Sequence, residues 1–479
     1  MEQQPTNENV CRARIDLLLL QAGARMRERF ARACDWLAGL RRRDRRKLLR
    51  RLRTSLALLA LLLATSGMPI PAHAASMTVA AGAAGLVTDG KCSLAEAIVN
   101  ANDDMAMWSD CPAGSGADTI TLPANATLSY TTPYDISNAL PPINSDITIE
   151  GFGSTIQRTG GPAFRIFSIR FGSLTLNRVT VKGGLINADR GAGIDAQGGS
   201  LTLKNSTVSG NNITGTNSQG GEGAGIAVMG SALIQNSTIS GNVVATNMLS
   251  SYGGGITSNG DLTIVNSTIS GNTSKAGGGI AIRFGSTTII NSTVTGNTAS
   301  ATLLANGRGG GIYGKPVLIA HTIVAGNTTT GSGNETFSVS LQTSNNTNLF
   351  GHSGESTGEA CFNWTSFGTD ITATSDGTQP TALASILNPT LANNGGPTQT
   401  HNLVAGSPAL DKATGNSCQA APVNGLDQRY KVRAAGASAT CDIGAVEFNA
   451  PTAVTLSSFN AKPGFDLVAW FKQMLGLAR

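Results

Sequence analysis

Acid–base catalysis by this chain would depend on a few carboxylates in its repetitive middle part. Between residues 185 and 330 the acidic residues are Asp189, Asp195, Glu222 and Asp261. Glycoside hydrolysis needs two carboxylates about 5 to 10 Å apart. Alignment of the repeats gives Asp195 no second carboxylate nearby, and it places Glu222 next to Arg190, which predicts a surface ion pair worth under about 1 kcal/mol. Asp195 and Glu222 are therefore only weak candidates, and no catalytic residue is predicted.

The residues that could bind metals or phosphates are equally sparse. The chain after residue 74 holds three histidines, which are His321, His352 and His401. His321 replaces an Asn of a repeated phrase, while His352 falls in a loop and His401 in a C-terminal motif, so all three are interpreted as structural. The GGGI phrases are followed by neither a helix nor a suitably placed Lys, which excludes a phosphate loop. Neither a metal nor a cofactor is predicted.

The elements that must position these residues come from a phrase repeated between residues 174 and 330. One form of the phrase ends in STISGN or STVTGN, and a second form reads GAGI or GGGI. The first Gly of each repeat falls at 183, 210, 241, 271, 296 and 326, so the period is 25 to 31 residues. Self-similarity at this period is typical of solenoids, propellers and arrays.

The content of each repeat decides between these architectures. In DLTIVNSTISGN two short runs alternate apolar and polar residues, and the segment around Ile256 supplies a third run. No window of the repeat has the apolar spacing of a helix. The sequence therefore predicts an all-β fold, a parallel β-helix with three strands per coil. Apolar residues of successive coils would stack inside, about 4.8 Å apart. The predicted inward stack consists of Val181, Val208, Ile239, Ile269, Val294 and Val324.

Asn recurs twice in each repeat. Asn tolerates left-handed turns, and its amide can bond the amide one coil away, which forms a ladder along the axis. The predicted structural ladder consists of Asn205, Asn236, Asn266 and Asn291. A second column with the same potential consists of Asn211, Asn242, Asn272, Asn297 and Asn327.

Residues 1–74 resemble a basic leader with an export signal. The run RRRDRRKLLRRLR precedes an apolar stretch, and Ala72-His73-Ala74 forms a small-x-small cleavage site. A basic amphipathic helix on a membrane surface is the alternative. The leader holds 15 of the 34 basic residues and six of the 29 acidic ones, so the remainder is mildly acidic. The overall net charge of +5 therefore gives no argument for nucleic-acid binding.

Five cysteines follow the leader. We predict disulfides between Cys92 and Cys111 and between Cys418 and Cys441, each closing a loop of about 20 residues and stabilising by about 3 kcal/mol in an oxidising compartment. Cys361 would then be buried and inert, or free. The alternative is that all five are reduced core residues. The predicted location is secreted or cell-surface, with no transmembrane segment in the mature chain.

Two segments resemble known bacterial domains. KCSLAEAIVNAND followed by DCPAGSGADTITLP is similar to the domain named for its CSLREA motif. LANNGGPTQTHNLVAGSPALDKA, LDQRYKVR and CDIGAVE resemble the choice-of-anchor Q domain of secreted β-helix proteins. The resemblance implies a right-handed, pectin-lyase-like β-helix on an exported protein, and it implies no established reaction. The predicted domains are a leader (1–74), an N-terminal cap (75–117), the β-helix (118–380), a C-terminal cap (381–448) and a tail (449–479).

The two flanking segments are expected to cap the ends of the solenoid, because open end coils expose apolar interior and strand edges. The SLAEAIVNAN segment has helical apolar spacing and predicts a short capping helix. Charge concentrates in the C-terminal segment, at Asp411, Asp427, Arg429, Arg433, Asp442 and Glu447. This cluster predicts a hydrogen-bonded cap, and a calcium or ligand site is the alternative.

Three functions are compatible with these features. The preferred hypothesis is an exported, non-catalytic surface or adhesion-type protein that contacts glycans or other cell-surface components. The alternative is a polysaccharide lyase or glycoside hydrolase with its site on an irregular loop, although the fold alone predicts no reaction. A third is a passenger similar to polymorphic outer membrane protein repeats, which share the GGGI-like phrases.

Overall fold

The computed structural model describes residues 74–448 apart from residues 84, 217, 302–306, 315–317, 344–346, 366–367, 414–417 and 434–439. The predicted leader up to residue 73 and the predicted tail, residues 449–479, lie outside this part. No helix in the described ranges is long and apolar enough to cross a membrane.

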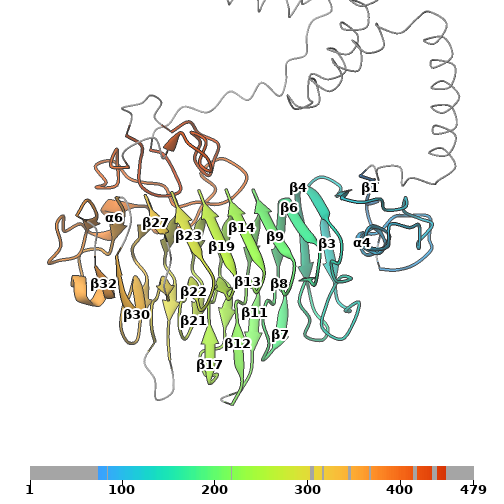
Figure 1. The fold of residues 1–479 in the computed structure, drawn as a ribbon, viewed down its shortest axis with the longest axis horizontal. Helices are drawn as coiled ribbons and strands as arrows, with labels where there is room; N and C mark the ends of the chain where they lie inside the picture. Colours follow the sequence, from blue (N-terminus) through green and yellow to red (C-terminus); the bar gives the residue numbers. More distant parts are fainter. Residues whose placement is uncertain are drawn as a thin grey trace, which may run out of the picture. The chain divides into compact units, whose positions relative to one another are not determined.

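The described chain is a parallel β-helix, as predicted, and all pairs between its named strands are parallel (Figure 1). Within the described residues its largest sheet has 17 strands and receives two strands from each regular coil. These strands are β1 (Ser76–Thr78), β2 (Asp118–Thr121), β3 (Thr127–Tyr130), β4 (Ile147–Arg158), β6 (Ser173–Lys182), β9 (Ser200–Lys204), β10 (Thr207–Ser209), β14 (Ser231–Gln235), β15 (Thr238–Ser240), β19 (Asp261–Val265), β20 (Thr268–Ser270), β23 (Thr287–Ile290), β24 (Thr293–Thr295), β27 (Leu318–Ala320), β28 (Ile323–Val324), β31 (Leu349–Phe350) and β33 (Ile371–Thr372).

A second sheet, of eight strands in the described part, receives one strand from each of eight successive coils. Its strands are β5 (Phe167–Ile169), β8 (Ile194–Ala196), β13 (Ile226–Val228), β18 (Ile256–Ser258), β22 (Ile280–Ile282), β26 (Ile312–Tyr313), β30 (Thr336–Thr343) and β32 (Cys361–Thr365). Outward-facing residues of this sheet are central to the candidate site below.

Each regular coil also has a fourth, very short strand that the sequence did not predict. These strands form a sheet consisting, where the chain is described, of β7 (Leu185–Asn187), β11 (Asn212–Thr214), β16 (Val243–Val244), β21 (Thr273–Ser274), β25 (Thr298–Ala299) and β29 (Thr328–Thr329). Two longer coils project and pair as β12 (Gly220–Glu222) and β17 (Ser250–Tyr252). A run of two or three residues is too short for alternation to signal a strand.

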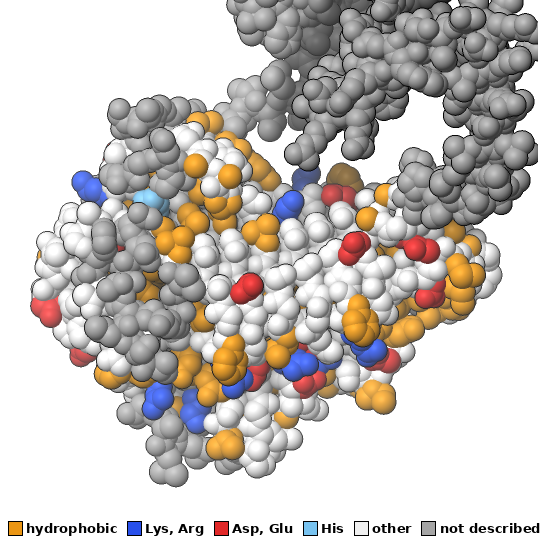
Figure 2. All heavy atoms as spheres, in the orientation of Figure 1, with side chains coloured by type: hydrophobic (Ala, Val, Ile, Leu, Met, Phe, Trp, Pro, Cys, Tyr) orange, Lys and Arg blue, Asp and Glu red, His pale blue; other side chains and the backbone are white. Residues whose placement is uncertain are grey.

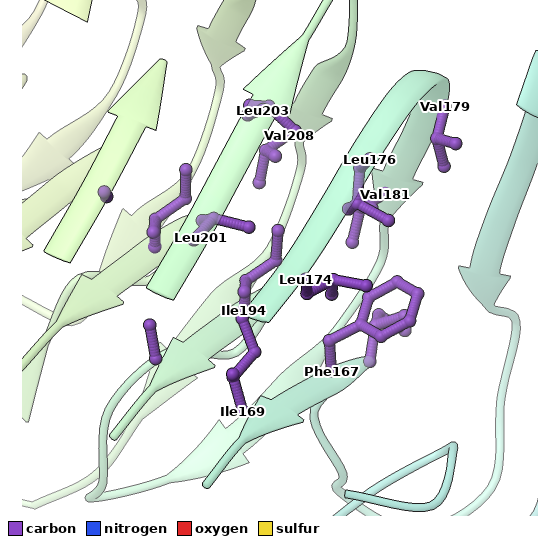
Figure 3. Close-up of a cluster of buried hydrophobic side chains, with 14 of the residues drawn as sticks. Phe167, Ile169, Leu174, Leu176, Val179, Val181, Ile194, Leu201, Leu203 and Val208 are labelled. Carbon is purple, nitrogen blue, oxygen red and sulfur yellow. The ribbon is translucent and has the colours of Figure 1, made fainter. Parts of the chain in front are cut away.

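The interior is an apolar stack, and it confirms the predicted column. Val181, Val208, Ile239, Ile269, Val294 and Val324 lie in register on successive coils and are all fully buried. Figure 3 shows the corresponding side chains of the first coils pointing toward one another between the sheets. Because each coil adds one member per column, the core grows along the axis without gaps.

The N-terminal end is covered by α4 (Leu94–Asp103), which confirms the predicted capping helix. A capping box starts the helix, since the Ser93 hydroxyl accepts from the Glu96 N–H and the Glu96 carboxylate accepts from the Ser93 N–H. Leu94, Ile98 and Ala101 are buried in the same core cluster as the first coils. Figure 1 places α4 beyond β3, at one end of the row of strands. The disulfide between Cys92 and Cys111 links the two sides of this cap.

The C-terminal segment lies along the side of the coils, and the prediction that it caps their end is wrong. The segment, which we call the C-terminal flank, comprises the described part of residues 388–448. It contacts every member of the column predicted as the Asn ladder, together with the histidine that continues it. The contacts are Tyr430 with Asn205, Thr398 with Asn236, Leu426 with Asn266, Cys441 with Asn291 and Gly444 with His321.

The physical reason for this placement is the conformation of that column, which we call the turn column. All five of its residues have positive φ, between 46° and 54°. The turns expose backbone and hydroxyl groups that need hydrogen-bond partners, and the C-terminal flank supplies them. Gln428, for example, accepts from the Thr268 hydroxyl at 2.6 Å and donates to the Thr238 hydroxyl at 2.9 Å.

The amide ladder itself forms in the other Asn column, so its assignment to Asn205, Asn236, Asn266 and Asn291 is also corrected. The side-chain Nδ2 of each Asn donates to the Oδ1 of the next, at 2.8 to 2.9 Å, along Asn211, Asn242, Asn272, Asn297 and Asn327. These amides are fully buried. The turn-column residues contact the C-terminal flank instead, although the Asn205 amide also donates to the Asn177 Oδ1 one coil away, at 2.9 Å.

Candidate functional site

The outer face of the eight-stranded sheet carries the most distinctive side chains. In β8, Ile194 and Ala196 face the core, so Asp195 between them faces outward. The equivalent residues on later coils are Ala227, Thr257, Ala281, Tyr313, Phe337 and Phe362. None of these residues is a carboxylate, as the alignment of the repeats predicted. After Asp195 the column has small side chains on three coils and aromatic side chains on the next three.

Tyr313, Phe337 and Phe362 of this column stack on one another, and Tyr252 of β17 joins them; we call these four rings the aromatic strip. Ring centroids are 5.9 Å apart for Tyr252 and Tyr313, 5.7 Å for Tyr313 and Phe337, and 4.7 Å for Phe337 and Phe362. The last two pairs are nearly parallel, at 11° and 5°. Rings stack because neighbouring coils are about 4.8 Å apart. Phe362 keeps 38% of its surface exposed, and both tyrosines are half-buried.

Basic side chains lie over these rings. The Arg308 guanidinium is 5.3 Å from the centre of the Phe337 ring, and that of Arg283 is 4.7 Å from the centre of Tyr252. Such contacts are attractive because the ring face is electron-rich. Arg308 is exposed, and neither Arg308 nor Lys275 forms an ion pair with a described residue. Figure 2 shows Lys and Arg side chains gathered with hydrophobic ones in a band across the lower half of the view.

A pocket of about 160 Å³ opens where the projecting coil meets the strip. It is lined by Leu249, Ser250, Ser251, Tyr252, Lys275, Ala276, Arg308 and Tyr313. The lining therefore combines two aromatic rings, two cations and two hydroxyl groups. We call this pocket together with the aromatic strip the strip groove.

Glu222 lies next to Tyr252 of the strip groove, because β12 pairs with β17, but its ion pair differs from the predicted one. The backbones of Arg190 and Glu222 do pair in the predicted register. The Glu222 carboxylate nevertheless binds Arg283, and it accepts from the Asn259 amide at 3.0 Å. Arg190 turns to Asp195 instead, with Nε 3.2 Å from Oδ1. The reason is burial, because a fully buried carboxylate needs a cation more than a surface one does.

Asp195 is a structural residue in this arrangement. Its side chain is fully buried, its Oδ2 accepts from the Gln197 amide at 2.8 Å, and the Arg165 guanidinium lies 3.7 Å away. Burial raises the pKa of Asp195, and the Arg165 charge opposes that rise. Arg165 also binds Asp189. Asp195 is thus held by Gln197 and two arginines, and the two weak catalytic candidates, Asp195 and Glu222, contact different partners.

The charged residues of the predicted C-terminal cap form a hydrogen-bonded network. Asp427 accepts from the Arg429 Nη2 at 2.7 Å and from the Glu447 N–H at 2.9 Å. The fully buried Arg433 pairs with Glu447 at 3.3 Å and donates to Asn266 of the turn column. Asp442 accepts from the Asp411 N–H at 2.8 Å. The arginines thus occupy the Asp427 and Glu447 carboxylates, and the Asp442 carboxylate accepts from the backbone N–H groups of Asp411 and Phe448, which supports the hydrogen-bonded network over a calcium site.

The remaining sulfur and histidine predictions have mixed outcomes. The second predicted disulfide, between Cys418 and Cys441, is present. Burial raises the pKa of the free Cys361 thiol to about 12, so it is inert as a nucleophile at neutral pH. His401 is structural, since its ring nitrogens lie 2.9 Å from the Ser270 hydroxyl and 2.8 Å from the Asn388 carbonyl.

Sequence reasoning missed one cluster, formed by Glu335, His352 and Glu355, which we call the Glu335 cluster. One ligand-type atom from each residue lies within 4.8 Å of the other two. Burial and the neighbouring Glu355 carboxylate raise the pKa of Glu335. The three-residue spacing of His352 and Glu355 was a visible signal. The contribution of Glu335 could not be seen in the sequence, because it depends on two coils being adjacent.

A larger pocket of about 460 Å³ lies near the N-terminal cap. Its lining is Ala83, Gly85, Leu86, Ala95, Leu128, Ser129, Tyr130, Thr131, Thr132, Pro133, Tyr134 and Ala139. None of these residues carries a charge, so the pocket lacks the groups that would orient an ionic or catalytic ligand. The strip groove is therefore the better candidate.

Comparisons with known proteins give one similar fold and no family. No protein-family model matches the sequence, and no curated protein matches it. Among solved structures, the crystal structure of pectate lyase Pel9A is similar, with a TM-score of 0.38 and 15% sequence identity over 69% of this chain and 88% of that chain.

Proposed function

We propose that this protein is exported and binds acidic glycans along the strip groove without cleaving them. The observation that carries the proposal is the aromatic strip, in which Tyr313, Phe337 and Phe362 repeat from coil to coil and Tyr252, two coils before Tyr313, extends the row. Sugar rings present C–H faces that pack on aromatic rings, and their hydroxyl groups bond to polar neighbours. A periodic row of rings therefore suits a periodic polymer.

The preference for acidic glycans follows from the cations of the strip groove. Arg308 and Lys275 line the pocket, and Arg283 lies beside them over Tyr252. Glu222, the acid of this groove, is already neutralised by Arg283. A uronate or sulfate group in the pocket would meet charge-assisted donors that form no ion pair with a carboxylate of the described chain.

The absence of catalysis is proposed from the carboxylates. Glycosidases hold two carboxylates on either side of the scissile bond. Here Asp195 is buried beneath its arginine partners, and Glu222 is engaged by Arg283 and Asn259. Neither carboxylate is free to act as acid or base. Export is supported by the two disulfides, which persist in oxidising compartments, and by the predicted leader.

The test is titration of the purified protein with a panel of neutral and acidic polysaccharides, followed by calorimetry. We expect acidic polymers to bind and the affinity to fall with added salt, because exposed charges are screened. Tyr313→Ala removes the ring at the centre of the strip and should lower the affinity at least about tenfold. Phe171→Ala, an equally aromatic change at a corner residue that is 77% exposed, is the matched control and should bind normally.

Three outcomes would contradict the proposal or a part of it. Equal binding by the wild type and Tyr313→Ala would place the glycan elsewhere on the molecule. Release of reducing sugars or unsaturated uronates by the wild type would show cleavage, which overturns the non-catalytic part. Binding of neutral polymers alone would remove the role assigned to Arg308 and Lys275.

A further inference from the structure

The Glu335 cluster lies where the buried amide ladder ends. Every ladder amide donates its Nδ2 in the same direction along the axis, and the last one, Asn327, donates to Glu335 Oε2 at 2.5 Å. The Gly326 N–H also donates to the Glu335 carboxylate, at 2.8 Å. The ladder therefore presents a row of aligned donors to one carboxylate, which favours its charged form.

Glu335 occupies a position that is Gly on the preceding coils. Ile312 and Thr336 are paired, so the residue before each of them is equivalent, and Gly311 corresponds to Glu335. A Cβ at Gly311 would approach the Asn327 amide to 2.9 Å. A side chain fits at this position only where no further ladder amide follows. The carboxylate of Glu335 thus takes the place of the next amide.

A second carboxylate faces the first. The Glu355 Oε1 accepts from the His352 N–H at 3.2 Å, and its Oε2 accepts from the Asn334 amide at 2.7 Å. Both glutamates are at least 95% buried. In the described chain no Lys or Arg forms an ion pair with either of them. Two buried carboxylates in contact, each surrounded by N–H donors, require a cation or a proton between them.

The imidazole completes a ligand set of suitable size. His352 Nδ1 lies 3.1 Å from a Glu355 oxygen and 3.9 Å from a Glu335 oxygen. Nitrogen and oxygen ligands at about 2.0 to 2.2 Å from a metal, in tetrahedral or octahedral geometry, are about 3.0 to 3.5 Å apart. The three ligand atoms lie within 4.8 Å of one another, so an ion would draw the set closer together. The His352 side chain is 25% exposed, which leaves a path for the ion.

We propose that Glu335, His352 and Glu355 bind one divalent first-row transition metal ion, such as Zn²⁺ or Mn²⁺, at the end of the amide ladder. The imidazole nitrogen favours these ions over Ca²⁺ and Mg²⁺, which prefer all-oxygen sites. The ion links the last ladder coil to the following loop. Phe337 of the aromatic strip is only two residues from Glu335 in the chain, but the proposal does not depend on glycan binding.

The experiment is calorimetric titration of the chelator-treated full chain with Zn²⁺ and, separately, with Mn²⁺. We expect one ion per chain and a higher melting temperature with metal, while Ca²⁺ and Mg²⁺ bind at least about tenfold more weakly. Glu335→Gln and His352→Gln should each lower the affinity at least about tenfold. Glu359→Gln is the matched control, because Glu359 is a nearby carboxylate that only caps α5 (Thr357–Ala360), and it should bind normally.

Several outcomes would overturn the metal site. These are no binding of Zn²⁺ or Mn²⁺ by the folded wild type, unchanged affinity in both ligand variants, or equal loss in Glu359→Gln. The first outcome would leave a shared proton as the occupant between the two glutamates. Since His352 is partly exposed, His352→Gln keeps the test valid if Glu335→Gln does not fold. Mn²⁺ electron paramagnetic resonance with and without His352 gives a readout independent of stability.

Discussion

Two sides of the same coils meet different partners. The turn column, Asn205 to His321, is covered by the C-terminal flank, which contacts each of its residues. The outer face of the eight-stranded sheet carries an equally regular stack, but there the aromatic rings and Arg308 keep exposed surface. Stacking alone therefore does not make a binding surface. The open side can bind a ligand because no distant segment of the described chain has filled it.

The largest expected effect tests the side of the coils where the C-terminal flank covers the turn column. Arg433→Met should lower the free energy of unfolding by about 3 to 5 kcal/mol, because it leaves the buried Glu447 carboxylate without its cation. Chemical denaturation measures the change. Glycan binding at the strip groove should be unaffected, since Arg433 contacts Asn266 on the other column. Loss of less than about 1 kcal/mol would contradict the assigned role of this network.

The next effect compares the buried amide ladder with the turn column. Asn272→Ala removes the acceptor of two donors from Asn242, at 3.0 and 2.9 Å, and a donor to the Ile239 carbonyl. Leaving these buried groups unpaired should destabilise by about 3 kcal/mol. Asn205→Ala, at a half-buried position of the turn column, should cost only about 1 kcal/mol, mostly because Ala adopts positive φ less readily. Equal costs would refute the distinction between the columns.

A smaller, pH-dependent effect concerns His321 beneath the C-terminal flank. Burial, together with the Arg433 charge, lowers the pKa of His321 to about 4 from an ordinary 6.5. Below pH 6.5 the unfolded chain takes up the proton first, so this contribution to stability is present above pH 6.5 and is lost as the pH falls toward 4. His321→Asn, which restores the residue of the earlier coils, should reduce acid destabilisation over this range by on the order of 2 kcal/mol. Melting temperatures of both proteins at several pH values measure it.

The smallest effect on stability is expected on the open side. Arg283→Met breaks a partly exposed ion pair with Glu222 and a contact with Tyr252, and it should change the free energy of unfolding by under about 1 kcal/mol. The same change should still weaken binding of an acidic glycan, because it removes a cation of the strip groove. A large loss of stability without loss of binding would show that Arg283 serves the fold and does not bind the glycan.

Local periodicity explains why so much of the β-helix was predictable. Each coil repeats the same pattern, so the register of Asp195 with Ala227, and of Val208 with Ile239, follows from alignment. Four-strand coils were not predicted, because strands such as β21 contain only two residues. The choice between the two Asn columns also failed, since both have the same residue type and differ only in which way the turn points them.

The candidate sites show the limit of sequence reasoning more sharply. Tyr252 and Tyr313 are far apart in the chain, and the pairing of coils brings their rings together. Arg283 and Glu222 come from coils that are two repeats apart, so a pairing based on equal positions chose Arg190 instead. Glu335 became notable only when the structure placed it against Glu355 and His352.

The sequence by itself determined the parallel β-helix, its inward apolar stack, its N-terminal capping helix and both disulfide pairings. Those features depend on spacing within a repeat or on short loops, which the order of residues records directly. Only the tertiary structure decided where the C-terminal flank lies, which Asn column forms the ladder, and which charged groups meet in the strip groove and in the Glu335 cluster. These outcomes depend on burial and on contacts between distant coils, where desolvation selects the partner of each polar group.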